Sequence, residues 1–249
     1  MLNILIIGEI CVDKFIYCDI KRLSPEAPVP ILQPLKTSEN PGMAGNTLSN
    51  IHALLPGWVT TLIGNDEIIT KTRYIEQKSN HMFLRVDEGE DKVTPFSWST
   101  DIDIMIGTAD IVIVSDYNKG FLRNLDLKEI GRKSTLSILD SKRKLTNDIV
   151  ENFSFVKLNE QESNNNPELE GDNIITTLGK QGAKYQNIIY KSPSPKDTID
   201  VSGAGDTFTA SFISKYFQSK NIPTSIKFAN KMSSEVVSKR GVSTPTSKL

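Results

Sequence analysis

The chain has 249 residues, and its 29 Lys and Arg against 30 Asp and Glu give a formal net charge of −1. This balance argues against an electrostatic nucleic-acid binder, which would carry a basic surplus or a basic tract. Hydrophobic residues make up 38% and charged residues 24% of the chain, which suits a packed core and is too apolar for a disordered protein. The sequence has no apolar run near the roughly 18 residues that span a bilayer, and its start lacks the pattern of a signal peptide. We therefore expect a cytoplasmic globular protein with neither a nucleic-acid nor a membrane partner.

The first ninety residues predict short strands around one helix. Residues 2–8 form an apolar run that ends in glycine, which is typical of a buried strand. Three prolines within residues 22–30 exclude a helix there and favour an extended path. Residues 42–55 carry apolar side chains at helical spacing and predict a helix. The further strands expected in this part are 12–18, 29–35, 59–63, 70–76 and 81–87, the last two joined by a polar turn at 77–80.

Beyond residue 100 the pattern changes to short apolar runs separated by longer segments, some of which could be helical. The expected strands are 111–114, 137–139, 155–158 and 174–178. This alternation indicates βαβ units and a parallel sheet, so the expected fold class is α/β. Residues 161–173 are polar and Asn-rich, and we expect part of them to form a surface loop. Two helices are expected near 203–217 and 223–239.

The segment with the clearest chemical signature is the run of small residues from Ser202 to Gly205, followed by Asp206. Small residues at a helix start would bring backbone N–H groups close to a ligand, where those groups and the helix dipole favour an anion such as a phosphate. A carboxylate beside an anion site is costly unless it has a function, and accepting a proton from an attacking hydroxyl is one. The alternative is that Asp206 only stabilises the helix start and the glycines only permit tight packing.

The segment Asp200-x-x-Gly203-Ala204-Gly205-Asp206-Thr207 resembles the C-terminal signature of the ribokinase-like, or PfkB-type, sugar kinases. The N-terminal third resembles one branch of them, the kinase domain of bifunctional heptose kinase/adenylyltransferases. The segments that match the family are 8–15, 22–30 with its SPEAPVP run, 41–46, 70–73, 84–87, 115–120 with its SDYNKG run, 140–142, 200–207, 229–230 and 239–244. These matches keep their order and cover almost the whole chain.

The resemblance implies a three-layer α/β/α sandwich of the ribokinase type, with a mostly parallel sheet, in a single kinase domain of residues 1–249. It also implies a small β-lid, from about 14–37 and 72–98, over the sugar site. Such a lid leaves an apolar face and an open edge, which favours a homodimer formed through the lids. A helix-sized segment that the family usually has is missing near 64–70, so one edge of the sheet is expected to be rebuilt or open.

The resemblance also implies roles for individual residues. Asp206 would be the catalytic base, and the anion hole for the transferred phosphoryl group would be formed by Gly203, Ala204 and Gly205. The residues expected to bind ATP are Asn159, Glu160, Gln161, Glu162, Thr177, Gly179, Gly182 and Asn230. Glu162 would act on Mg²⁺ indirectly, and K⁺ is a further candidate cofactor. The residues expected to bind the sugar are Asp13, Gly42 and Asn46, and those for the sugar's own phosphate are Lys71, Arg73 and Arg85.

Elementary chemistry agrees with this assignment, because Asp and Asn side chains can bind hydroxyls and Lys and Arg suit a phosphate. Simpler roles remain open for several of these residues. Asn46 could cap the helix that begins near it, Asp13 could be a turn residue at a strand end, and Arg73 and Arg85 could be solvated strand charges. Lys142 could simply be exposed. The chain also differs from the family pattern at Glu9, where the family has Asp, and at Met43, which follows Gly42.

The predicted reaction is the ATP-dependent phosphorylation of a sugar phosphate, D-glycero-β-D-manno-heptose 7-phosphate, at its anomeric hydroxyl. A separate nucleotidyltransferase is a candidate partner that would act next. Two alternatives remain open: a PfkB-type kinase of another sugar or of a nucleoside, and a non-catalytic protein that binds a sugar phosphate or a nucleotide.

Overall fold

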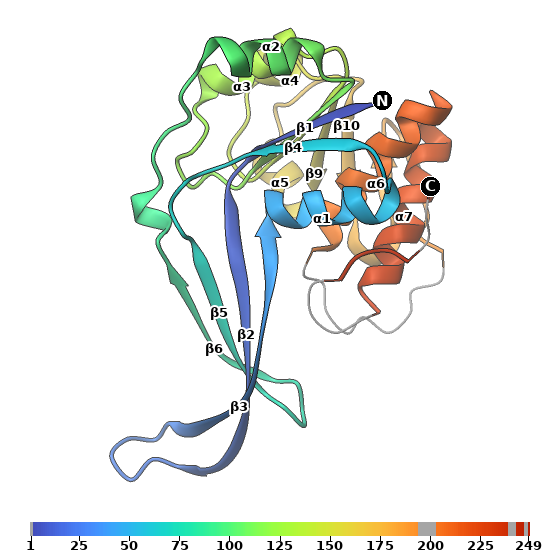
Figure 1. The fold of residues 1–249 in the computed structure, drawn as a ribbon. Helices are drawn as coiled ribbons and strands as arrows, with labels where there is room; N and C mark the ends of the chain where they lie inside the picture. The colour runs from blue at the N-terminus through green and yellow to red at the C-terminus, as the bar shows by residue number, and fades with distance from the viewer. Residues whose placement is uncertain (1, 194–202, 239–242, 247–248) are drawn as a thin grey trace.

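The computed structural model describes residues 2–193, 203–238, 243–246 and 249, and Figure 1 shows the arrangement of their elements. Asp200 and Ser202 of the C-terminal motif, and residues 239–242 of the last matching segment, lie outside the described residues. Two β-sheets and the helices packed on the larger one make up the described part. None of the helices in these ranges has the length and apolarity that crossing a bilayer demands.

The larger sheet has eight strands among the described residues, in the order β12-β11-β10-β9-β8-β7-β1-β4. Their bounds are β1 (Asn3–Gly8), β4 (Val59–Ile63), β7 (Ile111–Asp116), β8 (Ser137–Ser141), β9 (Phe155–Asn159), β10 (Ile174–Thr177), β11 (Ala183–Tyr185) and β12 (Ile188–Tyr190). The strands from β4 to β10 pair in parallel, and β11 and β12 are added antiparallel. The expected α/β fold with a mostly parallel sheet is thus confirmed.

Helices cover both faces of this sheet, which is why its central strands are apolar runs. Ile4 and Ile6 pack on the face of α1 (Ala44–Leu54), α6 (Ala204–Ser219) and α7 (Ile222–Val236). Leu5 and Ile7 alternate to the other face, with α2 (Thr100–Thr108), α3 (Asn124–Lys133) and α4 (Asn147–Val150). Each such fully buried side chain contributes about 1.5–3 kcal/mol relative to exposure. The three layers, with α5 (Glu160–Asn165) at their edge, hold the ends of the strands in fixed positions.

The smaller sheet has four strands, in the order β3-β2-β5-β6 in the described part of the chain, and it projects from the body like an arm (Figure 1). Its strands are β2 (Ile10–Leu23), β3 (Pro30–Met43), β5 (Thr70–Glu76) and β6 (Met82–Glu88). β2 follows β1 after one residue, and β3 leads directly into α1, so these two strands join the base of the arm closely to the body. The expected strands 12–18 and 29–35 are shorter than the observed β2 and β3. The two observed strands stay paired through polar residues as far as the body.

The register of the smaller sheet brings charged side chains onto one face, in two neighbouring rows. Asp13 lies beside Lys71, Lys71 beside Asp87, and Arg73 beside Arg85. Because side chains alternate along a strand, residues paired in this way lie on the same face of the sheet. The chain reaches β5 from β4 through only residues 64–69, and β4 is an edge strand of the larger sheet. Two short 3-10 turns complete the described elements, η1 (Glu90–Lys92) and η2 (Gly179–Gln181).

Candidate active site

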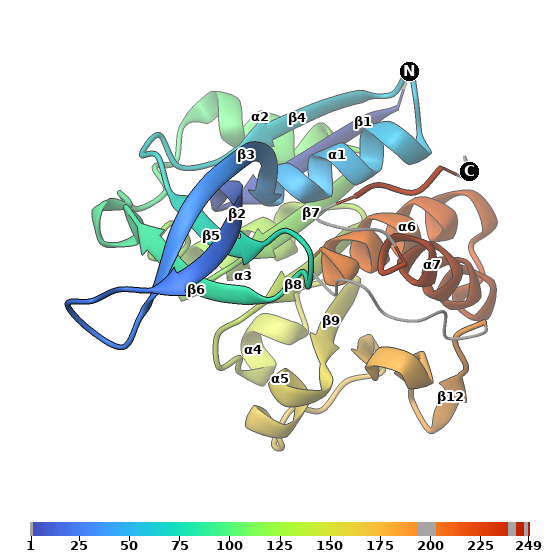
Figure 2. The ribbon, with the colours of Figure 1, turned by 90° about the horizontal axis from the view of Figure 1, so that it is seen from below.

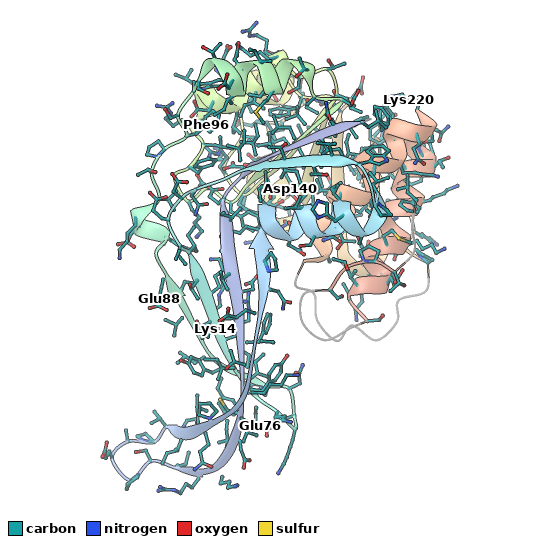
Figure 3. The ribbon with its side chains drawn as sticks, viewed as in Figure 1. Lys14, Glu76, Glu88, Phe96, Asp140 and Lys220 are labelled. Carbon is teal, nitrogen blue, oxygen red and sulfur yellow. The ribbon has the colours of Figure 1, made fainter. Side chains whose placement is uncertain are left out.

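The candidate site lies where the carboxyl ends of β7, β8 and β9 meet the start of α6. Open α/β sheets bind ligands at this end of their strands. Asp140, at the end of β8, lies inside the body of the molecule, whereas Lys14 and Glu76 lie on the projecting arm (Figure 3). A cavity of about 420 Å³ opens at this point, and its lining residues are Tyr117, Lys142, Lys157, Asn159, Glu160, Gln161, Thr177, Gly179, Gly203, Gly205 and Asp206.

Asp206 lies in the first turn of α6 and is 5% exposed. Gly203, just before the helix, has a φ of 80°, a conformation that favours glycine, and Ala204 begins the helix. The amide of Asn46 donates to Oδ2 of Asp206 at 2.7 Å, and the hydroxyl of Tyr117 donates to Oδ1 at 2.9 Å. A carboxylate held in this way at a helix start can receive a proton from a neighbouring hydroxyl.

The pKa of Asp206 is raised to about 6, first by burial and then by the negative charge of Asp140. The hydrogen bonds from Asn46 and Tyr117 and the charge of Lys157 act in the opposite direction. A carboxyl group with this pKa is largely ionised at neutral pH, yet it binds a proton more readily than an exposed aspartate. These two properties together suit a general base.

A buried lysine, Lys157, lies beside the first turn of α6. It is 2% exposed, and its Nζ is 2.9 Å from Oδ2 of Asp140. A Cβ at Gly205 would lie 3.0 Å from this Nζ, so the glycine leaves room for the ammonium group. Burial alone would raise the pKa of Asp140, but Lys142 and Lys157 hold it below its usual range. The contact with Asp140 places the ammonium group of Lys157 beside the proposed anion hole.

Asn159 and Glu162 form a reciprocal capping box at the start of α5. The Glu162 carboxylate accepts from the Asn159 backbone N–H and side-chain amide, both at 2.7 Å, and from Lys142 at 2.6 Å. Both of its oxygens are therefore engaged, which suits water-mediated action on Mg²⁺ better than direct ligation. Mg²⁺ commonly keeps several waters and binds substrate phosphates in this way. Lys142 is partly exposed and paired with Glu162 and Asp140, so it is more than a solvated charge.

The remaining residues expected to bind ATP divide into two groups. Glu160, Gln161, Thr177 and Gly179 line the cavity together with Asn159. Gly182 and Asn230 instead meet at the carbonyl oxygen of Tyr190: a Cβ at Gly182 would lie 2.1 Å from it, and the Asn230 amide donates to it at 2.7 Å. A nucleotide role for this second pair stays a prediction.

The residues expected to bind the sugar lie at the base of the arm. Asp13 is 8% exposed, and its Oδ1 is 2.5 Å from Nη1 of Arg73. A Cβ at Gly42 would lie 2.3 Å from Oδ2 of Asp13, so only glycine fits there without displacing this carboxylate. Asn46 is 2% exposed and does not cap α1, because the N-cap position is Met43. The Met43 side chain is itself buried, in a small cluster with Cys11 and Ile69.

The three cations expected to bind the sugar's phosphate are each paired with a carboxylate. Lys71 is 6% exposed and contacts both Asp87 and Glu90. Arg73 pairs with Asp13, and Arg85 makes two hydrogen bonds to Asp87, at 2.7 and 2.8 Å. Arg85 is exposed, whereas the side chain of Arg73 is 14% exposed and lies over the Phe15 ring.

Three residues of the site were not assigned roles from the sequence: Glu9, Tyr117 and Lys157. Glu9 is fully buried and accepts the backbone N–H groups of Tyr117, Lys119 and Phe121 at 2.8, 2.9 and 3.3 Å. Burial raises its pKa, with a smaller effect from Asp116. A sequence signal existed for two of these residues, because Lys157 interrupts an apolar strand and Glu9 directly follows one.

Comparison with known proteins adds independent findings. The family model "pfkB family carbohydrate kinase" matches residues 136–249. Bifunctional protein HldE of a Nitratiruptor species is 26% identical over 293 residues, which cover 98% of this chain and 63% of that protein. The chain thus spans less than two thirds of the length of the curated relatives it matches first.

Solved structures share the fold at low sequence identity. The ribokinase of Thermotoga maritima has a TM-score of 0.72 and 15% identity, covering 97% of this chain and 95% of its own. The ribokinase of Arabidopsis thaliana complexed with ribose and ATP has a TM-score of 0.69 and 14% identity, covering 97% of this chain and 94% of its own. These findings confirm the resemblance seen in the sequence: the chain is similar to pfkB-type carbohydrate kinases, and it shares its fold with the solved ribokinases.

Proposed function

We propose that this chain is an ATP-dependent kinase that phosphorylates a sugar phosphate, and that its acceptor is the anomeric hydroxyl of D-glycero-β-D-manno-heptose 7-phosphate. The observation that carries the proposal is the environment of Asp206. This buried carboxylate, with a pKa raised to about 6 by burial first, lies at the start of α6 on the wall of the cavity. It adjoins Asn46, from the sugar side, and lies on the same cavity wall as Lys157.

In the proposed reaction, the acceptor hydroxyl gives its proton to Asp206 while its oxygen forms a bond to the γ-phosphorus of ATP. The bond between that phosphorus and the oxygen of the departing ADP breaks. Backbone N–H groups from Gly203 to Asp206, together with the ammonium group of Lys157, would stabilise charge on the transferred group. Mg²⁺, when bound, neutralises charge on the nucleotide phosphates, and Asn159 and Glu162 would hold its waters.

The charges on the arm support an anionic acceptor rather than a neutral sugar. Arg73 lies directly opposite Arg85 on the neighbouring strand, and Lys71 lies one pleat away on the same face. Like charges directly opposite each other destabilise a sheet, and here Asp13 and Asp87 offset the repulsion between the two guanidinium groups. A phosphate group suits this position because guanidinium groups bind it through paired hydrogen bonds.

We propose further that the smaller sheet acts as a lid over the sugar. Asp13, Lys71 and Arg73 come from this sheet, whereas Asp206 comes from the body. Closure of such a sheet over the acceptor would exclude water and suppress the transfer of phosphate to water. The resemblance of the N-terminal third to the heptose kinase branch supports heptose 7-phosphate as the acceptor.

The test is ADP release from purified protein with MgATP and a panel of acceptors. The panel contains heptose 7-phosphate, heptose without the phosphate, fructose 6-phosphate, ribose and adenosine. We expect turnover with heptose 7-phosphate and a large loss of kcat/KM with heptose, because heptose lacks the phosphate group that Lys71, Arg73 and Arg85 would bind. Turnover only with ribose or adenosine would contradict the assigned substrate. ATP binding without ADP release from any acceptor would support the non-catalytic alternative.

A further inference from the structure

Tyr117 lies in a loop that is fastened to a buried carboxylate. It directly follows β7, in the SDYNKG segment. Three backbone N–H groups of this loop, from Tyr117, Lys119 and Phe121, donate to Glu9, which is 0% exposed. A buried carboxylate that accepts several backbone hydrogen bonds fixes the path of the loop, because breaking any of them leaves a buried polar group unpaired.

The fixed loop brings the Tyr117 hydroxyl to Asp206. The hydroxyl oxygen is 2.9 Å from Oδ1, while Asn46 donates to Oδ2 at 2.7 Å. Tyr117 also lines the cavity, and Nζ of Lys142 lies 5.7 Å from the centre of its ring. Burial first, and then the charges of Asp206 and Asp140, raise the pKa of Tyr117 well above its ordinary value. The hydroxyl therefore stays protonated and acts as a donor at working pH.

We propose that Tyr117 is a positioning residue of this kinase reaction, whose hydroxyl holds Oδ1 of Asp206 so that Oδ2 is directed to the acceptor hydroxyl. The inference rests on the proposed function. Tyr117 keeps its own proton throughout, and the proton of the acceptor passes to Asp206. Oδ2 can accept from both Asn46 and the acceptor, because a carboxylate oxygen has two lone pairs.

The hydrogen bond from Tyr117 also favours the ionised form of Asp206. The other groups that face this carboxylate are Asn46 from α1, Asp140 at the end of β8, Lys157 from β9, Lys142 beyond β8 and the Cys11 thiol from β2. They remain in place when only the phenolic hydroxyl is removed. Loss of the hydroxyl should therefore raise the pKa of Asp206, and a stronger donor at the same position should lower it.

The experiment compares the wild type with Tyr117→Phe, which keeps the ring and its contact with Lys142. The pKa of Asp206 is measured by NMR of ¹³C-carboxyl-labelled aspartate, assigned with Asp206→Asn, and the pH profile of kcat/KM is recorded in parallel. We expect the pKa to rise from about 6 to about 7, the size of shift that follows the loss of one hydrogen bond to an ionised carboxylate. The fall in kcat/KM should then be about fivefold larger at pH 6 than at pH 8.5, where the remaining loss measures the lost positioning of Asp206.

The matched control is Tyr216→Phe, on the same helix as Asp206 and half-buried against the core, which should leave both readouts unchanged. A second probe is 3-fluorotyrosine at position 117, whose hydroxyl is more acidic than that of tyrosine and is therefore a stronger hydrogen-bond donor. It should shift the acidic limb of the kcat/KM profile to lower pH. If the ring had only a structural role, neither Tyr117→Phe nor 3-fluorotyrosine would shift this limb. Unchanged pKa values of Asp206 in both probes would overturn the inference. Absence of turnover in the wild type would overturn the proposed reaction instead, and the NMR titration would still decide whether Tyr117 acts on Asp206.

Discussion

Gly42 lies where the backbone of β3 passes closest to the Asp13 carboxylate. A Cβ at this position would lie 2.3 Å from Oδ2 of Asp13 and 2.6 Å from Sγ of Cys11. Gly42→Ala should therefore displace Asp13 from the sugar and raise KM for the sugar by about tenfold, as a cost of roughly 1–3 kcal/mol for overpacking implies. Steady-state kinetics with varied sugar concentration measures this effect.

The control for this substitution is Gly107→Ala in α2, where an added Cβ meets nothing within 4 Å. Alanine in place of a helical glycine should raise stability by about 0.5–1 kcal/mol and leave KM unchanged. An unchanged KM in Gly42→Ala would show that Asp13 does not contact the sugar.

The sequence predicts the position of Asp206 better than it predicts the residues that contact it. The small residues before Asp206 form a local pattern, so its place at a helix start followed from the sequence and is confirmed. Its two partners are not local: Asn46 is 160 positions away and Tyr117 is 89. Asn46 was found through the family motif, whereas the contact of Tyr117 depends on a loop whose path Glu9 fixes.

At the scale of elements, Glu90 links the arm to the body. Its carboxylate pairs with Lys71 of β5 and with Lys119 of the loop after β7. Glu90→Gln would remove one of the two carboxylate partners of Lys71 and leave Asp87 as the other. We expect inorganic phosphate to bind several-fold more tightly, because the positive charges of Lys71, Arg73 and Arg85 are then balanced by one carboxylate fewer. Isothermal titration calorimetry with inorganic phosphate measures this without requiring turnover.

Glu88→Gln is the matched control, since Glu88 lies at the exposed end of β6 and makes no ion pair within the described residues. It removes the same charge from the same region and should change phosphate binding little. Equal effects of both substitutions would mean that net charge alone, rather than the pairing of Lys71, determines phosphate binding.

The elements themselves were predicted best where apolar runs are buried on both faces. The expected strands 111–114, 137–139 and 155–158 are confirmed as β7, β8 and β9. β11 and β12 were missed because each has three residues, too few to show a period. Residues 160–165 form α5 within a segment expected partly as loop, since the capping box of Asn159 and Glu162 outweighs the Asn-rich composition.

At the scale of the whole molecule, the arm exposes apolar side chains. The exposed ones of β2, β3, β6 and the β2–β3 turn are Leu23, Val29, Leu35, Met82, Phe83 and Leu84. Such a surface on an open sheet favours association. We propose that a second copy of the chain covers it, so sedimentation velocity should show a dimer, and Leu84→Lys should shift it to monomer.

Leu125→Lys is the control for this substitution, because Leu125 is 71% exposed on α3, in the layer of the body that carries α2 and α4. Figure 1 shows α3 at the top of the body and the arm at the bottom, and in Figure 2, seen from below, the arm lies in front of the body. This variant should stay dimeric. A monomeric wild type, or equal dissociation by both variants, would contradict a dimer formed through the arm.

The sequence predicts the fold class of the whole molecule better than it predicts the lengths of the strands in the arm. Alternating strands and helices predicted the parallel sheet, and the motifs in their order predicted the family. The length of β2 and β3 did not follow, because Lys36, Ser38 and Asn40 pair with β2 without an apolar pattern of their own. Their place in the sheet is set by the neighbouring strand rather than by local preference.

The most direct test of the account is the rate of ADP release by Asp206→Asn with MgATP and heptose 7-phosphate, with ATP affinity measured in the same preparation. Asparagine keeps the shape of the side chain and its place beside Asn46 but cannot take up the acceptor's proton. We expect kcat to fall by about 10²–10⁴, as for the loss of a general base, with ATP affinity nearly unchanged. A variant that keeps more than about a tenth of the wild-type kcat would contradict the role of Asp206 as the base.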